Sequence, residues 1–106
     1  MRQMTATELH QHLGAQAAAP LLLDVREPSE FAICRIDGAE LIPMHQVPHH
    51  LDELDRDRET VVICHHGIRS HQVALFLEHY GFTDIINLSG GVAAWARDID
   101  PSMATY

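Results

Sequence analysis

The sequence predicts an α/β protein in which a parallel sheet is covered by helices on both faces. Short apolar segments of the kind found in buried strands alternate along the chain with segments whose apolar residues recur at helical spacing. Glycine and proline lie at several junctions between them. This alternation favours a parallel sheet, because the connections between parallel strands are usually helices that lie on its faces.

The first element is a short helix. Thr5 and Glu8 have the spacing of a capping box, and they precede apolar residues at Leu9 and Leu13. Residues 15–19 then form a connection of small residues that leads to a proline.

Short strands and helical turns follow. Leu21 to Leu23 predicts a buried strand that ends at Asp24, and Pro28 to Ala32 predicts a single helical turn. Glu40 to Ile42 predicts a second, short strand. Helical spacing returns in three apolar residues, which are Val47, Leu51 and Leu54.

The second half of the chain contains two strands, each followed by a helix. Thr60 to Cys64 predicts the central strand, and Ile85 to Leu88 predicts the last one. The helix after the central strand is closed by Gly81, and its apolar positions are Val73, Phe76, Leu77 and Tyr80. The final helix begins after Ser89-Gly90-Gly91, and its apolar positions are Val92, Trp95, Ala96 and Ile99.

Length and charge limit the classes of function. The chain has 106 residues, of which 46% are hydrophobic, and this is enough for the core of one domain over residues 1–106. Fifteen acidic residues stand against seven basic ones, all arginine, and the formal net charge is −8. We therefore expect no nucleic-acid partner, and an anionic substrate needs a local positive charge.

The sequence also predicts a compartment. No segment has the length and hydropathy of a membrane span, and Met1 to Leu13 lacks the apolar stretch of a secretory signal. Two cysteines, Cys34 and Cys64, are too few for a disulfide framework or a zinc ribbon. These features predict a cytoplasmic protein in a reducing environment, with no membrane partner.

A candidate active site follows the central strand. In a parallel sheet, ligands bind beyond the carboxyl ends of the strands, where Asp24 and Cys64 would emerge. The loop amides and the positive N-terminal field of the next helix would favour the thiolate of Cys64. Gly67 lets the loop bring its amides close to an anion, and Arg69 supplies a permanent positive charge.

Each of these residues also has a purely structural interpretation. Cys64 can be a small apolar residue at a strand end, and Arg69 can form a surface salt bridge. His65 and His66 can be plain loop residues that tune the local potential, or general acids, acceptor-recognition groups or metal ligands. Adjacent side chains in a loop usually point apart, so we expect the two histidines to do so. Cys64, Gly67 and Arg69 together at the start of a helix favour a functional cysteine.

Four motifs between about Leu21 and Trp95 carry a family resemblance. They are Asp24-Val25-Arg26-Glu27 with Glu30-Phe31, Ile36-Asp37-Gly38-Ala39 with Ile42-Pro43, Cys64-His65-His66-Gly67-Ile68-Arg69-Ser70, and Asn87-Leu88-Ser89-Gly90-Gly91 with Trp95. In this order they resemble the motifs of the single-domain rhodanese family. The resemblance implies a rhodanese-like five-stranded parallel sheet with helices on both faces, in a single rhodanese domain.

The resemblance also implies a thiosulfate sulfurtransferase in which Cys64 carries a persulfide. The substrate-binding cradle would be the backbone amides of His65, His66, Gly67, Ile68, Arg69 and Ser70. Arg69 would bind the anionic part of the donor. Asp24 and Arg26 would lie outside the substrate contacts, where Arg26, paired to Glu30 or to Asp24, would hold the neighbouring loop.

The same resemblance implies the reaction partners. They are a small-molecule sulfur donor, thiosulfate or a persulfide, and a thiol or cyanide acceptor, while a protein donor or acceptor also fits the loop. Neither a metal nor an organic cofactor is implied.

The chain departs from the family at Cys34-Arg35, where Gly-His is usual. Cys34 is either an ordinary buried thiol or a second cysteine that resolves a Cys64 persulfide into a disulfide. A disulfide requires the two α-carbons to lie within about 7 Å.

Two other classes of function remain open. Cysteine phosphatases and arsenate reductases also place a cysteine before an amide-lined loop and an arginine. Between Cys64 and Arg69 this chain has four residues, one fewer than the phosphatase pattern. The third class is a binding module that keeps the fold and either delivers sulfur only within a complex or merely recognises a partner. The physiological donor, the oligomeric state and the role of residues 98–106 are not fixed by the sequence.

Overall fold

A computed structural model describes residues 1–15 and 18–106, so two residues of the predicted connection, 16 and 17, lie outside the described residues. All strand pairs are parallel, and the order in the sheet is β1-β5-β4-β2-β3. The strands are β1 (Arg2–Met4), β2 (Leu21–Asp24), β3 (Glu40–Leu41), β4 (Thr60–Ile63) and β5 (Ile85–Leu88). The helices are α1 (Ala6–Ala15), α2 (Pro28–Ile33), the 3-10 helix η1 (Met44–Glu53), α3 (Ile68–His79) and α4 (Gly91–Asp98).

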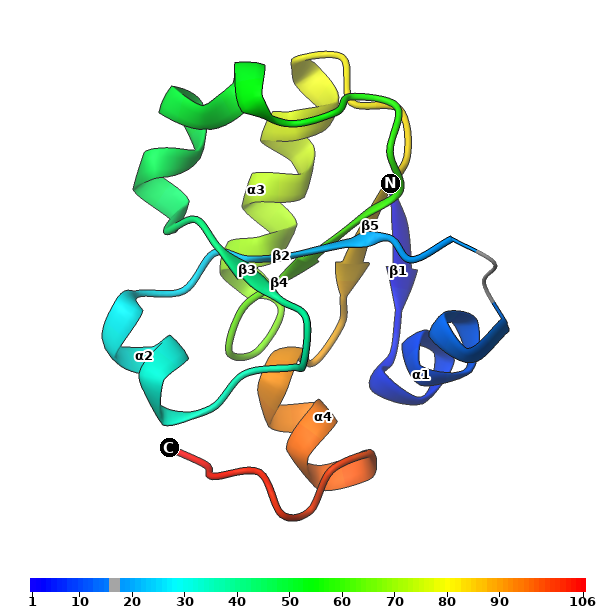
Figure 1. Cartoon of the computed structure of the whole chain (residues 1–106), viewed down its shortest axis with the longest axis vertical. Helices are drawn as coiled ribbons and strands as arrows, with labels where there is room; N and C mark the ends of the chain where they lie inside the picture. The colour runs from blue at the N-terminus through cyan, green and yellow to red at the C-terminus, as the bar shows by residue number, and fades with distance from the viewer. Residues whose placement is uncertain (16–17) are drawn as a thin grey trace.

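Each face of the sheet has its own core, because alternate residues of a strand point to opposite sides. Leu22, Val61 and Ile63 pack with residues of α1 and α4. Leu23 and Val62 pack on the other face with residues of α3 and η1. Figure 1 shows this arrangement, with α3 and η1 on one side of the sheet and α1 and α4 on the other. The predicted parallel sheet covered on both faces is confirmed.

Most predicted elements are found within one residue of their expected bounds. The capping box is confirmed, since the Glu8 N–H donates to Thr5 Oγ1 (3.1 Å) and the Thr5 N–H donates to Glu8 Oε1 (2.9 Å). The strand expected from Thr60 to Cys64 ends at Ile63, which leaves Cys64 as the first residue after it. Cys64 therefore emerges at the carboxyl end of the central strand, as predicted.

Three local details differ from the prediction. The edge strand β1 (Arg2–Met4) was not expected, because its short, largely exposed sequence carries no apolar run. The segment with Val47, Leu51 and Leu54 forms a 3-10 helix that contains Pro48 and ends before Leu54. Tyr80, expected on the apolar face of α3, follows the helix and is 49% exposed.

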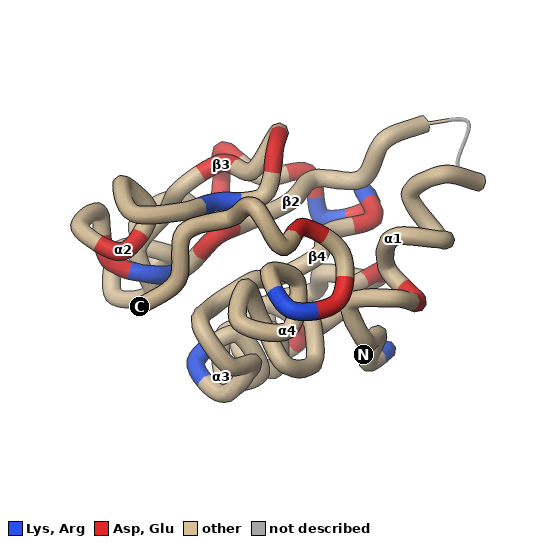
Figure 2. Tube along the Cα trace, turned by 90° about the horizontal axis from the view of Figure 1, so that it is seen from below, with Lys and Arg blue, Asp and Glu red and all other residues tan. Residues whose placement is uncertain are grey.

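The helices of this chain are short. Over the residues that the structure describes, none of them combines the length and the apolar character that crossing a bilayer requires. Figure 2 shows Asp and Glu at many points of the chain, in keeping with the acidic composition.

The start of α4 fixes the loop that follows β4. The N–H groups of Val92 and Ala93 donate to the carbonyl oxygens of Cys64 (2.9 Å) and His65 (3.1 Å). This contact requires glycine at position 91, where φ is +59°. A Cβ at Gly91 would lie 2.3 Å from the Cys64 oxygen and 2.4 Å from the His65 oxygen. The helix and the loop therefore pack backbone against backbone.

We expect Gly91→Ala to lower the free energy of unfolding by at least about 2 kcal/mol, because it adds a clash to an unfavourable backbone conformation. Gly14→Ala in α1 is the matched control, since a Cβ there meets no atom within 4 Å. That change should stabilise the protein by up to about 1 kcal/mol, because alanine is the better helix former. Urea unfolding of the two variants measures both effects, and equal stabilities would contradict the backbone contact.

Candidate active site

The Cys64 side chain is buried and faces the backbone of its own loop. The N–H groups of Gly67 and Ser70 donate to its sulfur, at 3.1 and 3.3 Å. The Ser70 hydroxyl oxygen lies 3.3 Å from the same sulfur, and a hydroxyl can rotate to donate when the sulfur is ionised. Both amides sit at the start of α3, where the helix dipole favours negative charge. These N–H donors are placed to bind negative charge on that sulfur or on a group attached to it.

The shape of the loop depends on Gly67, the residue before α3. Its φ is +95°, in the region that glycine adopts without strain. A Cβ there would meet the Gly90 nitrogen at 3.0 Å and the Leu88 oxygen at 3.1 Å. The loop is therefore held between α3 and the end of β5, with its amides turned toward the sulfur.

Asn87 is a supporting residue that lies in the fourth family motif but was not assigned a role. Its Nδ2 donates to the Gly67 carbonyl (3.2 Å) and to Gln3 Oε1 (2.9 Å). It thus joins the loop to β5 and β1. The available signal was a polar residue inside an otherwise apolar strand, because a buried amide normally holds specific partners.

Arg69 lies at the start of α3, as expected, but its guanidinium is paired. Nη1 and Nη2 donate to the two carboxylate oxygens of Glu30, at 2.8 and 2.9 Å. The hydrogen bonds from Arg69 lower the pKa of Glu30 to about 2 despite its partial burial. The salt-bridge interpretation of Arg69 therefore describes its contacts, and a donor anion would have to share Arg69 with Glu30.

Asp24 and Arg26 form a fully buried ion pair at the end of β2. Arg26 Nε lies 3.0 and 3.1 Å from the two carboxylate oxygens, and Nη2 donates at 2.7 Å. Neither side chain has exposed surface. Burial alone would lower the pKa of Arg26, but the bonds to Asp24 and Tyr106 outweigh it and raise that pKa. Of the two predicted partners, Asp24 supplies the carboxylate, and Glu30 contributes its backbone oxygen (3.3 Å).

Tyr106 connects the end of the chain to these groups. Its hydroxyl accepts a bond from Arg26 Nη1 (2.9 Å) and donates to Glu30 Oε1 (3.0 Å). Its ring stacks on His65 with the centroids 4.0 Å apart. Both Figure 1 and Figure 2 show the C-terminus beside α2. The C-terminal segment, whose role was open, packs across the domain next to the active loop.

The expectation that His65 and His66 point apart is wrong. Their rings stack, with centroids 4.0 Å apart and an angle of 30° between the planes. The Tyr106 ring also stacks on His65, which holds that ring in place. Burial, and secondly the neighbouring His66, lower the pKa of His65, so it is largely neutral at pH 7.

Cys34 is partly buried and lies next to the Arg26 guanidinium. Its sulfur is 3.8 Å from Arg26 Nη1, and its carbonyl oxygen accepts a bond from Arg26 Nη2 (2.6 Å). Cys34 also lines a cavity of about 120 Å³ with His65, His66 and Tyr106. Within residues 1–15 and 18–106, no three metal-binding side chains are grouped so as to hold a metal ion.

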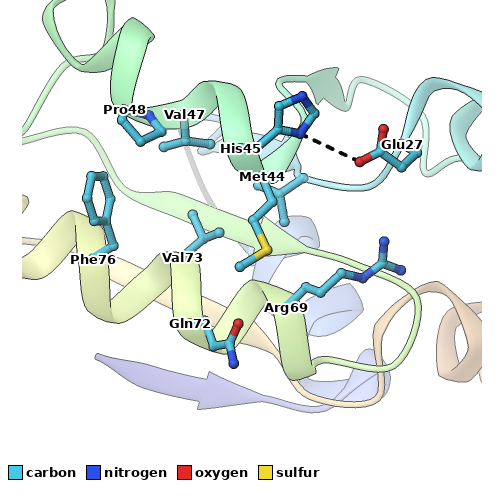
Figure 3. Close-up of a pocket in the computed structure, with 10 residues that line it drawn as sticks. Glu27, Met44, His45, Val47, Pro48, Arg69, Gln72, Val73 and Phe76 are labelled. Carbon is cyan, nitrogen blue, oxygen red and sulfur yellow. Dashed lines mark ion pairs between the residues drawn. The ribbon is translucent and has the colours of Figure 1, made fainter.

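A larger pocket, of about 550 Å³, lies beside the active loop between η1 and α3. Figure 3 shows its lining, which is mostly apolar. Arg69 is the residue of the active loop that borders it, and this pocket was not predicted from the sequence.

Comparison with known proteins identifies the family. The model of the rhodanese-like domain matches residues 5–98. A sulfurtransferase of Allochromatium vinosum is 36% identical over 104 residues, which cover 98% of this chain and 96% of that protein. The thiosulfate sulfurtransferase GlpE of Shewanella oneidensis is 36% identical over 76% of this chain and 79% of its own.

Similar domains also occur inside longer proteins. The probable adenylyltransferase/sulfurtransferase MoeZ of Mycobacterium tuberculosis is 40% identical over 80% of this chain, but only 22% of that protein is covered. Among solved structures, a rhodanese-like domain protein of Staphylococcus aureus has a TM-score of 0.82 and 34% identity, with 90% of this chain and 91% of that chain covered. A cysteine held by loop amides at the end of β4, together with these matches over nearly the whole chain, places this protein in the rhodanese-like domain family, whose members here include sulfurtransferases.

Proposed function

We propose that this protein is a sulfurtransferase that moves sulfane sulfur from thiosulfate or a persulfide donor to cyanide or a thiol through a persulfide on Cys64. The observation that carries the proposal is the Cys64 sulfur, which accepts bonds from the Gly67 and Ser70 amides at the start of α3. Such a site stabilises an anion at the sulfur, both as a thiolate and as the terminal sulfur of a persulfide.

In the first half-reaction the Cys64 thiolate attacks the outer sulfur of thiosulfate. A new S–S bond forms to Cys64, the original S–S bond breaks, and its electron pair leaves with sulfite. The product is Cys64–S–S⁻, whose charge the loop amides stabilise. With a persulfide donor the leaving group is a thiolate instead.

In the second half-reaction an acceptor attacks the terminal sulfur of the persulfide. Cyanide becomes thiocyanate, or a thiolate becomes a persulfide, and the electron pair of the broken S–S bond returns to Cys64 as a thiolate. Because the acceptor arrives after the first product has left, ping-pong kinetics are expected.

Thiosulfate is the proposed small-molecule donor for two reasons. The relative from Shewanella oneidensis is named for that substrate. Arg69 borders the loop with a planar guanidinium that suits sulfonate oxygens, while its bonds to Glu30 use only two of its five N–H groups. A protein donor or acceptor is the second candidate, because the domain related to this chain in MoeZ is part of a longer protein.

Incubation with thiosulfate should add about 32 Da, one sulfur atom, to the intact mass of the wild type. Cyanide should remove the added mass, and the Cys64→Ser variant should gain none. Electrospray mass spectrometry of the intact protein measures both steps.

Cys34→Ser is the matched control and should still gain one sulfur. If wild type gains no mass from thiosulfate or from a low-molecular-weight persulfide, free sulfur transfer is wrong, and delivery from a protein partner replaces it.

We expect Glu30→Gln to lower the KM for thiosulfate, because the Arg69 guanidinium is then released from a competing carboxylate. The decrease should reach up to about tenfold, equal to about 1.4 kcal/mol of binding free energy. Steady-state kinetics with cyanide as acceptor measure it. Glu53→Gln, which removes the same charge outside the site, is the control and should leave the KM unchanged. A higher KM in Glu30→Gln would mean that Glu30 orients Arg69 rather than competing for it.

Acid unfolding tests the ion pair itself. Because Arg69 lowers the pKa of Glu30 from 4.5 to about 2, the pair stabilises the fold fully above about pH 4.5, and this contribution is lost as the pH falls toward 2. We therefore expect wild type to lose up to about 3 kcal/mol more stability than Glu30→Gln between pH 5 and pH 2. Urea unfolding of both proteins at pH 5 and pH 2 measures this difference. An equal loss of unfolding free energy in wild type and Glu30→Gln would contradict a stabilising ion pair.

A further inference from the structure

The pocket between η1 and α3 has one wall that is a regular stripe of α3. Arg69, Gln72, Val73 and Phe76 occupy positions i, i+3, i+4 and i+7, which share one face of a helix. The opposite wall comes from the first half of η1, through Met44, His45, Val47 and Pro48, and Val25 and Glu27, between β2 and α2, complete the lining. Its volume of about 550 Å³ lies within the usual range of small-ligand sites.

The two ends of the pocket differ in polarity. Figure 3 shows Arg69 and Glu27 toward one end, and Phe76 and Pro48 at the other. The polar end also holds His45, whose Nδ1 lies 3.7 Å from Glu27 Oε1. Met44, Val47 and Val73 form the apolar surface between the ends, and they pack in the same core cluster as Cys64. An occupant must therefore be polar at the Arg69 end and apolar along the rest of its length.

The polar end is also the end nearest the reacting sulfur along α3. Ser70, whose N–H donates to Cys64 Sγ, directly follows Arg69 in the chain. From Arg69 to Phe76 is seven residues, or about 10 Å along the helix axis. The pocket therefore starts at the loop that holds Cys64 and runs two turns of α3 away from it.

We propose that this pocket binds the apolar arm of an organic sulfane-sulfur donor, a molecule with an anionic sulfur-bearing head and an alkyl or aryl arm up to about 10 Å long. The inference rests on the proposed sulfur transfer and names its substrate class. The head lies beside Arg69 and the arm lies along Val73 toward Phe76. With a thiosulfonate, R–SO₂–S⁻, the Cys64 thiolate takes the outer sulfur as Cys64–S–S⁻, and the broken S–S bond leaves its electron pair on the sulfinate R–SO₂⁻.

A series of donors with increasing arm length tests the proposal. We expect kcat/KM with cyanide as acceptor to rise from methane- through butane- to hexanethiosulfonate by at least tenfold in total, since each fully buried methylene contributes up to about fourfold. Thiosulfate is the donor without an arm. A kcat/KM that does not change with arm length overturns the proposal.

Two variants on α3 distinguish an effect of the pocket lining from a general effect of substitutions on this helix. Gln72→Trp places a large ring in the pocket from an exposed position and should abolish most of the gain between the methane and hexane donors. Leu75→Ala is the matched control, because Leu75 is 49% exposed and does not line the pocket. It should leave the hexane-to-methane ratio unchanged. An equal ratio in Gln72→Trp and wild type overturns the proposal.

Binding without reaction distinguishes failure of the pocket from failure of sulfur transfer. Hexanesulfonate has the head and arm but no transferable sulfur, and titration calorimetry on Cys64→Ser measures its affinity. It should bind at least tenfold more tightly than methanesulfonate, and equal affinities overturn the proposal.

If Cys64 gains sulfur from thiosulfate while arm length has no effect on rate or affinity, the proposed function stands and the pocket assignment is wrong. If arm length raises affinity but no donor transfers sulfur, the pocket binds the arm and the proposed function is wrong.

Discussion

The buried pair of Asp24 and Arg26 organises the surroundings of the active loop. An unpaired charge at this depth would be strongly destabilising, so the pair depends on excellent geometry and on partners for the remaining N–H groups. Those partners are the backbone oxygens of Glu30 and Cys34 and the Tyr106 hydroxyl. One guanidinium thereby connects the end of β2, helix α2 and the end of the chain.

Through Glu30 the effect of this pair extends to Arg69. The Glu30 backbone accepts a bond from Arg26, while its carboxylate binds Arg69 and accepts a bond from the Tyr106 hydroxyl. The Arg69 guanidinium beside the active loop is thus bound to Glu30, which contacts residues from distant parts of the sequence. The cysteine cradle itself is local, because the amides that bind the Cys64 sulfur lie within six residues of it. A local anion site and a nonlocal charge network meet at Arg69.

This division explains what the sequence could predict. Strands β2, β4 and β5 carry short apolar runs, and helices α1, α3 and α4 carry apolar residues at helical spacing or caps, so their existence and approximate bounds follow from local rules. Strand β1 does not, because three largely exposed residues at a sheet edge have no such pattern. The motif around Cys64 was evident for the same local reason. The bond from Arg69 to Glu30 joins residues 39 positions apart, that from Asn87 to Gly67 joins residues 20 apart, and that from Arg26 to Tyr106 joins residues 80 apart. The Tyr106 ring that stacks on His65 is also distant in the sequence. No sequence spacing indicates these contacts.

The contact between α4 and the active loop has a consequence for dynamics. The Val92 and Ala93 amides are bonded to the carbonyls of Cys64 and His65, and the close approach at Gly91 leaves no room for either backbone to shift alone. Separation of α4 from the sheet therefore releases the segment whose amides hold the sulfur, and the two open as one cooperative unit. Hydrogen exchange at the first turn of α4 thus reports how often the sulfur-binding loop is intact.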